Sequence, residues 1–342
     1  MKQSDPASRL DDLLEKTSRT FALAIPLLPD PLRREVTVAY LLFRIADTFE
    51  DAVDWPPARR MRALADFACL LENPDPQEGK RLAAEWLRSP PVPHEGYLEL
   101  LGETCLVMKC YGALRPPVRA AVGEHTRRTA AGMAEFVDRA RGSAGVLRLE
   151  SLQELRDYCY VVAGIVGEML TELFLLEPGM EKVAVPLRAR ARRFGEALQL
   201  VNILKDSEDD ASEGRVFLPA SVSRSEVLSL ARAELRAAAE YTLTLQRSGA
   251  ADGVVAFNAL PVRLAWATLD RVEAEGPGAK VSRAQLWQII EGTRSAIAYR
   301  RPALELEEPM PPRRSRSAST HVRTPGRRTD DPSPGPGAEA VP

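Results

Sequence analysis

Apolar residues recur at helical spacing along most of the chain, and proline-rich breaks divide it into helix-length segments. Ser151 with Glu154, and Ser223 with Glu226, have the spacing of capping boxes, so we expect helices to begin there. Strand-like alternation bounded by tight turns is lacking, as is a repeat of fixed period. The pattern predicts an all-α protein, whose breaks lie at 26–31, 56–57, 73–76, 90–93, 116–117 and around Pro178.

The two ends of the chain differ from its middle. Residues 1–8 are polar, and residues 303–342 are rich in proline, serine and arginine, so both segments are predicted to be disordered around a helical domain at 9–302. The start does not resemble a signal peptide, and no run approaches the roughly 18 to 20 apolar residues of a membrane span. We therefore expect a cytoplasmic protein without a transmembrane anchor.

Composition narrows the classes of function. The chain has 342 residues, is 45% hydrophobic and has a formal net charge of −2, which suits a large buried core. Near-neutral charge gives no basic footprint for nucleic acid. The 4 cysteines form no Cys-x-x-Cys pair and are expected to be reduced, and the 3 histidines are scattered, which disfavours a zinc site or a histidine-based triad.

Two acidic clusters interrupt the apolar pattern. Asp47 and Asp51 form a first acidic row, and Asp206 and Asp210 form a second. Each row places two carboxylates four positions apart, about 40° apart around a helix, where like charges repel unless a cation lies between them. Mg2+ typically takes one or two carboxylates and leaves the rest of its shell to water and phosphate oxygens. Two such rows therefore predict a diphosphate held through Mg2+.

Each row continues as a longer stripe along its helix. Tyr40 and Arg44 precede the first row, and Gln199 and Asn202 precede the second, all at spacings of three or four. The alternative is that both stripes are solvated helix faces, as most charge-rich stretches are. Their neighbours, however, are apolar on most sides, which is typical of helices buried in a large core.

Four segments resemble, in order, the motif set of the squalene and phytoene synthases, the head-to-head trans-isoprenyl diphosphate synthases. The segments are residues 18–25, 40–51, 158–168 and 199–210. The resemblance extends over about residues 15 to 300. It implies an all-α isoprenoid synthase fold around one central cavity, and the Mg2+-dependent condensation of two identical allylic diphosphates through a cyclopropyl intermediate.

The resemblance also assigns roles to individual residues. Ionisation of an allylic diphosphate requires stabilisation of the charge that develops as the C–O bond breaks. The expected metal ligands are Asp47, Glu50, Asp51, Asp206 and Asp210. The expected cations are Arg19, Arg44, Lys205 and Arg215. Tyr40 and Tyr158 would face the carbocation, and the remaining substrate contacts would come from Phe21, Gln199 and Asn202, with small residues at Ala163, Gly164 and Gly167 shaping the channel.

The motifs favour squalene as the product. Ile25 and the Asp-Thr-x-Glu-Asp pattern at 47–51 resemble squalene synthases of the eukaryotic kind, which reduce the intermediate with NADPH. The resemblance places Arg19, Arg44, Lys205 and Lys280 near the cofactor phosphate. Lys205 departs from the family, where arginine is usual, and keeps the charge but loses the bidentate fork. The late motif at 264–266 lacks its usual tyrosine, so phytoene or dehydrosqualene synthesis without NADPH stays open.

Two other classes of function fit less well. A head-to-tail prenyltransferase or terpene cyclase usually begins its first motif with two aspartates, whereas this chain has Ala46-Asp47. A non-catalytic isoprenoid-binding protein would lose metal ligands, and both acidic rows are retained here. Eukaryotic squalene synthases carry a C-terminal membrane anchor that is not expected in this chain, although peripheral membrane contact would suit the release of an apolar product.

Deletion of the residues after Pro309 tests the predicted tail. A segment with so little apolar surface cannot add to the core, so we expect unchanged activity and an unchanged melting temperature. Differential scanning calorimetry of the truncated and full-length proteins checks this. A clear fall in melting temperature would show that the tail is docked.

Overall fold

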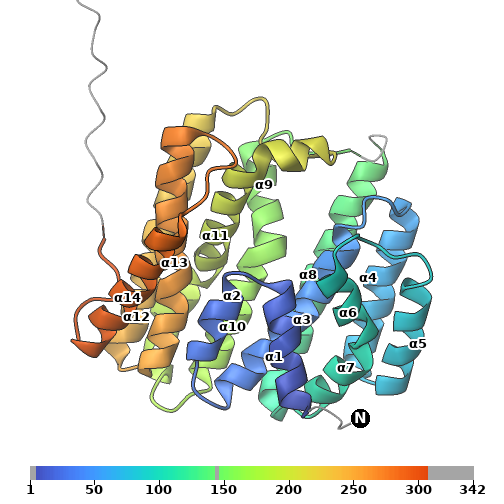
Figure 1. The fold of residues 1–342 in the computed structure, drawn as a ribbon, viewed down its shortest axis with the longest axis horizontal. Helices are drawn as coiled ribbons and strands as arrows, with labels where there is room; N and C mark the ends of the chain where they lie inside the picture. The colour runs from blue at the N-terminus through green and yellow to red at the C-terminus, as the bar shows by residue number, and fades with distance from the viewer. Residues whose placement is uncertain (1–4, 143–145, 307–342) are drawn as a thin grey trace, which may run out of the picture. The chain divides into compact units, whose positions relative to one another are not determined.

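The computed structural model describes residues 5–142 and 146–306, and α-helices make up most of this part of the chain (Figure 1). Its α-helices are α1 (Pro6–Thr17), α2 (Phe21–Ala24), α3 (Leu32–Glu50), α4 (Pro57–Glu72), α5 (Pro76–Trp86), α6 (Glu95–Gly102), α7 (Thr104–Gly112), α8 (Pro116–Arg141), α9 (Leu152–Cys159), α10 (Ile165–Leu175), α11 (Ala184–Ser212), α12 (Arg224–Ser248), α13 (Asp252–Glu275) and α14 (Arg283–Ala298). Short turns of 3-10 helix lie at Ile25–Leu27 and Glu181–Val183, and a π-helical turn, Tyr160–Gly164, joins α9 to α10.

The predicted helix boundaries are confirmed. Proline occupies the first turn of α4, α5 and α8, where its missing N–H costs no hydrogen bond. Ser223 and Glu226 form the expected capping box at the start of α12. At α9 the serine cap is present, but Glu154 accepts from the N–H of Glu150, one residue before the cap, so that box is only half formed.

The ends of the domain lie outside the boundaries predicted for it. Helix α1 already begins at Pro6, and Ala303 and Leu304 are buried against the domain. Residues 1–4 and 307–342, which hold most of the two segments predicted to be disordered, lie outside the described residues. By length and composition alone, one helical run in the described chain, Leu152–Leu175, could cross a membrane, although Glu168 and Glu172 interrupt its apolar residues. Just over half of it, 56% of its apolar window, is buried in the domain, as in a core helix.

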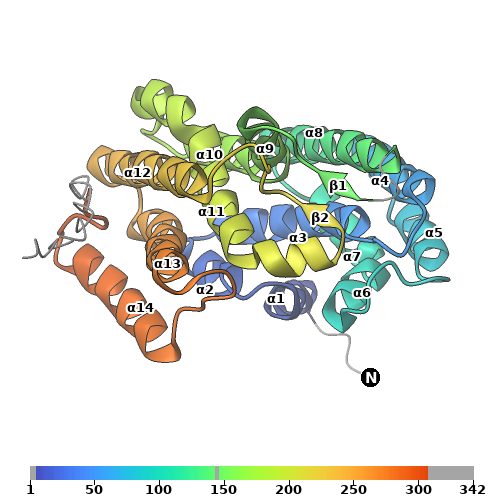
Figure 2. The same cartoon turned by 90° about the horizontal axis from the view of Figure 1, so that it is seen from above.

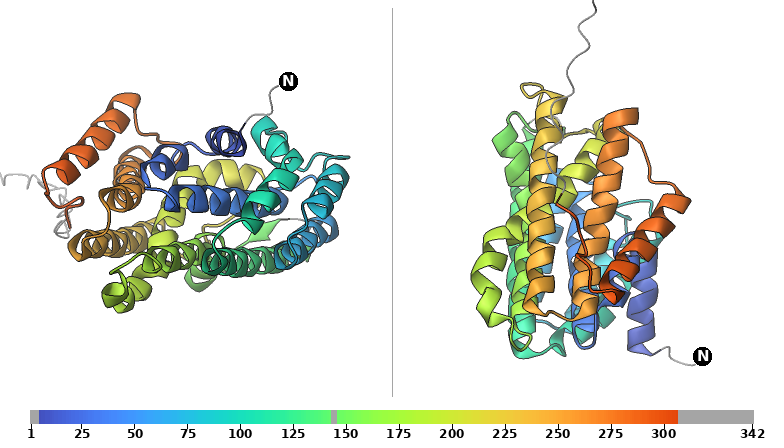
Figure 3. Two further views of the ribbon diagram at one scale, coloured as in Figure 1. Left: turned by 90° about the horizontal axis from the view of Figure 1, so that it is seen from below. Right: turned by 90° about the vertical axis from the view of Figure 1, so that its left-hand side faces the viewer.

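Helices α3 and α11 run through the middle of the bundle (Figure 2). Helix α11 packs against α10, α12 and α13, while α3 packs against α4, α8 and α1. Helices α1 and α2 cover one side of this pair, and α14 packs against α13 at the edge of the unit (Figure 3). The buried face of α3 is wide, as its apolar sequence predicted, so the acidic rows lie on central helices of the core.

Glycines bring the α9–α10 run into backbone contact with α11. A Cβ atom on Gly167 would lie 2.1 Å from the carbonyl oxygen of Ala191, and one on Gly195 would lie 1.9 Å from that of Ala163. A Cβ on Gly164 would lie 2.8 Å from the ring of Tyr160. These glycines therefore make room for a neighbouring helix, and Gly167 together with Ala163 also lines the inner cavity described below, as expected for residues that shape the channel. Gly164 contacts Tyr160 and lines neither cavity of the site.

A short strand pair is a feature of the described fold that the sequence pattern did not suggest. Strands β1 (Leu147–Arg148) and β2 (Arg215–Val216) pair in parallel, and Leu147 and Leu149 donate to the carbonyls of Gly214 and Val216. Two residues are too few to leave an alternating pattern. The pairing ties the chain after α8 to the chain after α11, and it holds Arg215 in place.

Gly195→Ala tests the backbone contact between the helices. Alanine is the better helix former by about 1 kcal/mol, but overpacking against a carbonyl oxygen typically costs about 1–3 kcal/mol. We expect a net fall in the free energy of unfolding, measured by urea denaturation. Gly112→Ala in α7 is the matched control, because its Cβ would meet nothing within 4 Å. Equal stability of the two variants would contradict the prediction.

Candidate active site

Two adjoining cavities lie between α3 and α11. The outer cavity has a volume of about 690 Å3 and a charged lining that includes both acidic rows. The inner cavity has a volume of about 180 Å3 and a largely apolar lining. The residues that line both are Phe21, Arg44, Asp47, Val162, Gln199 and Asn202. A ligand that fills both cavities therefore needs a charged head and an apolar tail.

The first acidic row lines the outer cavity from the C-terminal end of α3. Arg44 forms an ion pair with Asp47, with Nη1 and Oδ2 3.3 Å apart. The same guanidinium lies over two aromatic rings, 5.7 Å from the centroid of Tyr40 and 5.2 Å from that of Tyr97. Tyr97 comes from α6 and was not predicted, because it lies in none of the motifs. Its contact fixes Arg44 at the junction of the two cavities.

The second acidic row faces the same cavity from α11. Asp206 and Asp210 line it together with Gln199 and Asn202, one stripe of the helix as predicted. Lys205 also lines the cavity, and its Nζ lies 3.0 Å from Oδ2 of Asp206. The structure thus brings both predicted stripes together around one space, although they lie about 160 positions apart in sequence.

Arg215 links the two acidic rows directly. Its Nη1 lies 3.0 Å from Oδ1 of Asp51, and its Nη2 lies 3.0 Å from Oδ1 of Asp210. A third carboxylate, that of Glu213, lies 2.7 Å from Nη2. The residue belongs to β2, so the strand pairing places its guanidinium between the helices.

The negative charges of the buried carboxylates are only partly balanced by neighbouring cations. Burial, partly offset by Arg44 and reinforced by Asp51, raises the pKa of Asp47 to about 6. Burial and the neighbouring Asp51 raise the pKa of Glu50 to about 8. The pKa of Asp210 is also raised, chiefly by burial, although Arg215 opposes the rise. Each carboxylate would be stabilised by additional positive charge in the outer cavity.

The donor set fits a hard divalent cation. All the acidic groups offer carboxylate oxygens, the ligands that Mg2+ prefers. Within residues 5–142 and 146–306, no three acidic, histidine or cysteine side chains converge into a ready-made metal site. The four aspartates instead stand as two pairs on facing helices. That arrangement suits ions that take one or two carboxylates and share a bound anion.

Glu50 and Tyr158 form the floor of the outer cavity. The Tyr158 hydroxyl donates to Oε1 of Glu50 at 3.4 Å, and the Tyr158 ring stacks on Phe217 with centroids 4.5 Å apart. Arg60 donates to the backbone carbonyl of Glu50 from behind. Burial and the nearby acidic groups raise the pKa of Tyr158, which keeps its hydroxyl protonated. Phe217 was not predicted, and it follows β2 directly.

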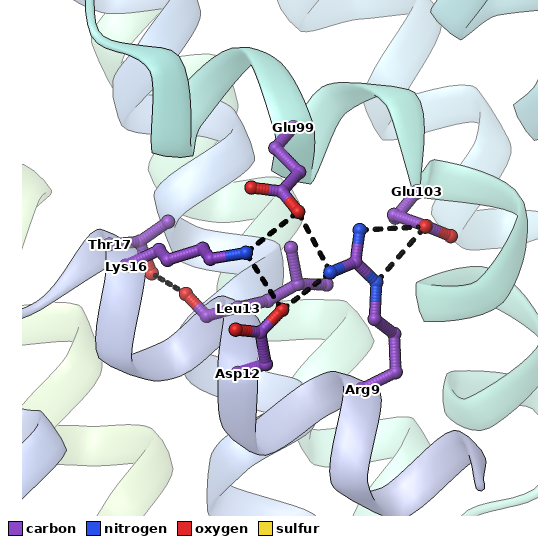
Figure 4. Close-up of polar contacts among 7 residues, drawn as sticks. All are labelled: Arg9, Asp12, Leu13, Lys16, Thr17, Glu99 and Glu103. Carbon is purple, nitrogen blue, oxygen red and sulfur yellow. Dashed lines mark hydrogen bonds and ion pairs between the residues drawn. The ribbon is translucent and has the colours of Figure 1, made fainter. Parts of the chain in front are cut away.

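Helix α1 and the turn after it form the remaining wall, which includes Arg19. An ion-pair network attaches α1 to α6, in which Lys16 contacts Glu99 and Arg9 contacts Glu99 and Glu103 (Figure 4). Exposed pairs of this kind contribute only about 0–1 kcal/mol each. The buried side chains of Leu10, Leu13 and Leu14, together with the hydrogen bond from Tyr40 to the carbonyl of Thr17 at 2.8 Å, hold α1 more firmly.

The predicted site residues line these cavities, with the exceptions of Lys280 and Gly164. Tyr40 lines the inner cavity, and Phe21 lines both. Lys280 is exposed on the loop between α13 and α14 and lines neither cavity. Its loop is nevertheless near the site, because the N–H of Gly278 donates to the carbonyl of Lys205 at 2.7 Å. His94 and Phe257, which the motifs did not indicate, line the outer and the inner cavity respectively.

Comparison with known proteins agrees with this geometry. The family model for squalene/phytoene synthase matches residues 14–288. The chain belongs to the squalene/phytoene synthase family. Squalene synthase of Schizosaccharomyces pombe is 31% identical over 214 residues, 63% of this chain. That match spans 44% of the yeast protein, so the chain corresponds to less than half of this relative.

Solved structures show the same fold. A structure described as a complex of TcSQS with the ligand E5700 superposes with a TM-score of 0.70 at 25% identity, covering 84% of this chain and 85% of the other. A dehydrosqualene synthase in complex with a ligand superposes with a TM-score of 0.52 at 18% identity, covering 86% of this chain and 97% of that one. The predicted all-α isoprenoid synthase fold is therefore confirmed. Members of this family transfer prenyl groups and bind prenyl diphosphates.

Binding of Mg2+ with inorganic diphosphate tests the acidic rows. A ligand that binds only the folded state raises the melting temperature, so the wild type should be stabilised by the two ions together. We expect Asp47→Asn and Asp206→Asn each to lose most of that increase, because each removes a carboxylate from one row. Asp209→Asn on the same helix as Asp206 is the matched control, since Asp209 does not line the outer cavity. An undiminished increase in either row variant would contradict the two-row site.

Proposed function

We propose that this protein condenses two farnesyl diphosphates head to head, through presqualene diphosphate, to squalene, with Mg2+ and with NADPH as reductant. The observation that carries the proposal is the junction of two unlike cavities. A charged space with two facing acidic rows opens onto an apolar one at Arg44 and Asp47. An allylic diphosphate has this same division into a charged head and an apolar tail.

The charged residues would hold the diphosphate head. Asp47, Asp51, Asp206 and Asp210 would bind Mg2+, with Glu50 beside them, and the metal would supply positive charge to the leaving diphosphate. Arg44 and Arg19 offer guanidinium groups that grip phosphate oxygens bidentately, and Lys205 offers a point charge. Arg215 now occupies the gap between the two acidic rows, where it pairs with Asp51 and Asp210. In this proposal its guanidinium would move away from these two carboxylates when the metal ions bind, and would then contact the diphosphate.

The aromatic residues would shield the allylic cation from water. Loss of diphosphate leaves an allylic cation, and water must be excluded until the new C–C bond forms. Tyr40, Phe21 and Phe257 line the inner cavity, where aromatic rings can stabilise positive charge. The Tyr158 hydroxyl remains protonated and can donate a hydrogen bond toward departing oxygens from the floor of the outer cavity.

The choice of squalene rests on the motifs and on the relatives. Ile25 is buried and lines the inner cavity, and the acidic pattern at 47–51 matches squalene synthases of the eukaryotic kind. The curated relative from yeast is named squalene synthase. Arg19, Arg44 and Lys205 line the outer cavity and fit a cofactor phosphate as well as a substrate diphosphate. Lys280 would contact NADPH only from the rim, because it lies outside both cavities.

Product analysis tests the proposal. Farnesyl diphosphate with Mg2+ alone should yield the cyclopropyl diphosphate or its hydrolysis products. When NADPH is added, the main product should become squalene. Lipid extraction and mass spectrometry identify the products. Asp47→Asn should reduce turnover by about 100 to 1000-fold or more, because charge stabilisation in the transition state is lost.

Other products would redirect the assignment. A conjugated triene formed from geranylgeranyl diphosphate in saturating NADPH would identify a phytoene-type enzyme in place of a squalene synthase. Binding of farnesyl diphosphate without any product, in the wild type and with all cofactors present, would instead identify a non-catalytic isoprenoid-binding protein.

A further inference from the structure

A third cavity lies beyond the inner one, at the end of the bundle away from the acidic rows. This rear cavity has a volume of about 170 Å3. Leu32, Phe174 and Val254 contribute to its wall, and the turn that joins α12 to α13 closes one side of it. Its volume is close to that of the inner cavity, 180 Å3, and neither the motifs nor the comparisons give it a role.

Three helices show that the rear cavity continues the inner one. Helix α3 contributes Val36 to the inner cavity and Leu32 to the rear cavity, four positions away. On α10, Leu170 lines the inner cavity and Phe174 the rear one, again four positions away. On α13 the corresponding residues are Phe257 and Val254, three positions apart. Each step is about one helical turn, or roughly 5.4 Å, so the two cavities are neighbours along the bundle.

Two phenylalanines separate the cavities. Phe257 lines the inner cavity and Phe174 lines the rear one. Their rings meet edge to face, with centroids 6.1 Å apart and an angle of 77° between the planes. Both side chains are only 1% exposed. The contact between these two rings therefore lies between the inner and rear cavities, and a movement of the Phe174 ring away from Phe257 would widen the path between them.

The inner cavity is small for the proposed substrate. An engineered apolar cavity of about 150 Å3 holds benzene, so about 180 Å3 holds a group only slightly larger. A farnesyl chain has fifteen carbons, and the outer cavity has a charged lining that disfavours an apolar chain. The next space in line is the rear cavity, which is lined mostly by apolar residues and whose one acidic residue, Glu177, is paired with Arg115.

We propose that the prenyl tail passes the Phe174–Phe257 partition into the rear cavity, and that Phe174 determines the length of chain that the site accepts. This inference rests on the proposed function. Phe174 acts as a specificity-determining residue: its ring occupies the path of the terminal isoprene units and limits how far they reach. The acidic rows would bind the diphosphate head at the other end of α3. The distance between these rows and the Phe174–Phe257 partition would therefore limit the length of the prenyl chain.

Binding of unreactive thiolo-diphosphate analogues with C15 and C20 chains tests this inference by isothermal titration calorimetry in the presence of Mg2+. Phe174→Ala should shift the ratio of the two affinities toward the C20 analogue by about tenfold or more, as an apolar pocket does when it gains room. Phe174→Leu should shift it in the same direction and by less, and it keeps the test available if the alanine variant does not fold.

Two further variants separate a specific effect from a general loosening. Val254→Phe fills the rear cavity and should weaken both analogues, the C20 one more, while leaving the binding of inorganic diphosphate with Mg2+ unchanged. Phe67→Leu removes the same atoms from a buried phenylalanine of α4 that lines none of the three cavities, and it should leave the ratio unchanged.

The outcomes distinguish this inference from the function on which it rests. A wild type that binds Mg2+ and inorganic diphosphate but neither analogue would overturn the proposed function and this inference together. A wild type that binds the analogues, with the same affinity ratio in the wild type, Phe174→Ala and Val254→Phe, would overturn this inference alone. A shift in Phe67→Leu equal to that in Phe174→Leu would also overturn it.

Discussion

Mutual repulsion among carboxylates around one cavity is the constraint on which the rest of this structure depends. Asp47, Glu50 and Asp210 lie where burial raises their pKa values, so each is costly to ionise. The fold offsets part of that cost with Arg44 on the first row and with Arg215 between the rows. A buried charge requires a partner of opposite sign, and these cations supply it while leaving the outer cavity open to further positive charge.

The acidic rows can act together only if their helices hold a fixed separation. Close backbone contact at Gly167 and Gly195 fixes the α9–α10 run against α11 without intervening side chains. Helix α3 is buried along most of its length, and so its orientation is fixed by packing on several sides. Ligand groups mounted on such helices are positioned more accurately than groups on loops. The Arg215 bridge is the exception, and it depends on a strand pair of two residues.

One helix organises the polarity of the whole site. Along α3 the cavity-lining residues change from Leu32 and Val36, through Tyr40 and Arg44, to Asp47 and the first acidic row. A charged head has no counter-charges at the apolar end, and an apolar tail gains nothing at the charged end. The sequence of α3 therefore orients an amphipathic ligand in one direction and leaves the length of its tail to the phenylalanines of α10 and α13.

The sequence by itself determined the helical fold, the helix boundaries, and the identity of the two acidic rows. These features depend on local spacing: proline breaks, serine caps, and carboxylates four positions apart all act within a few turns of one helix. Tertiary structure alone decided the Arg215 bridge, the contact of Tyr97 with Arg44, the exposed position of Lys280 and the Phe174–Phe257 partition. Each of these depends on how residues far apart in the chain pack together, and their spacing along the chain contains no record of that packing.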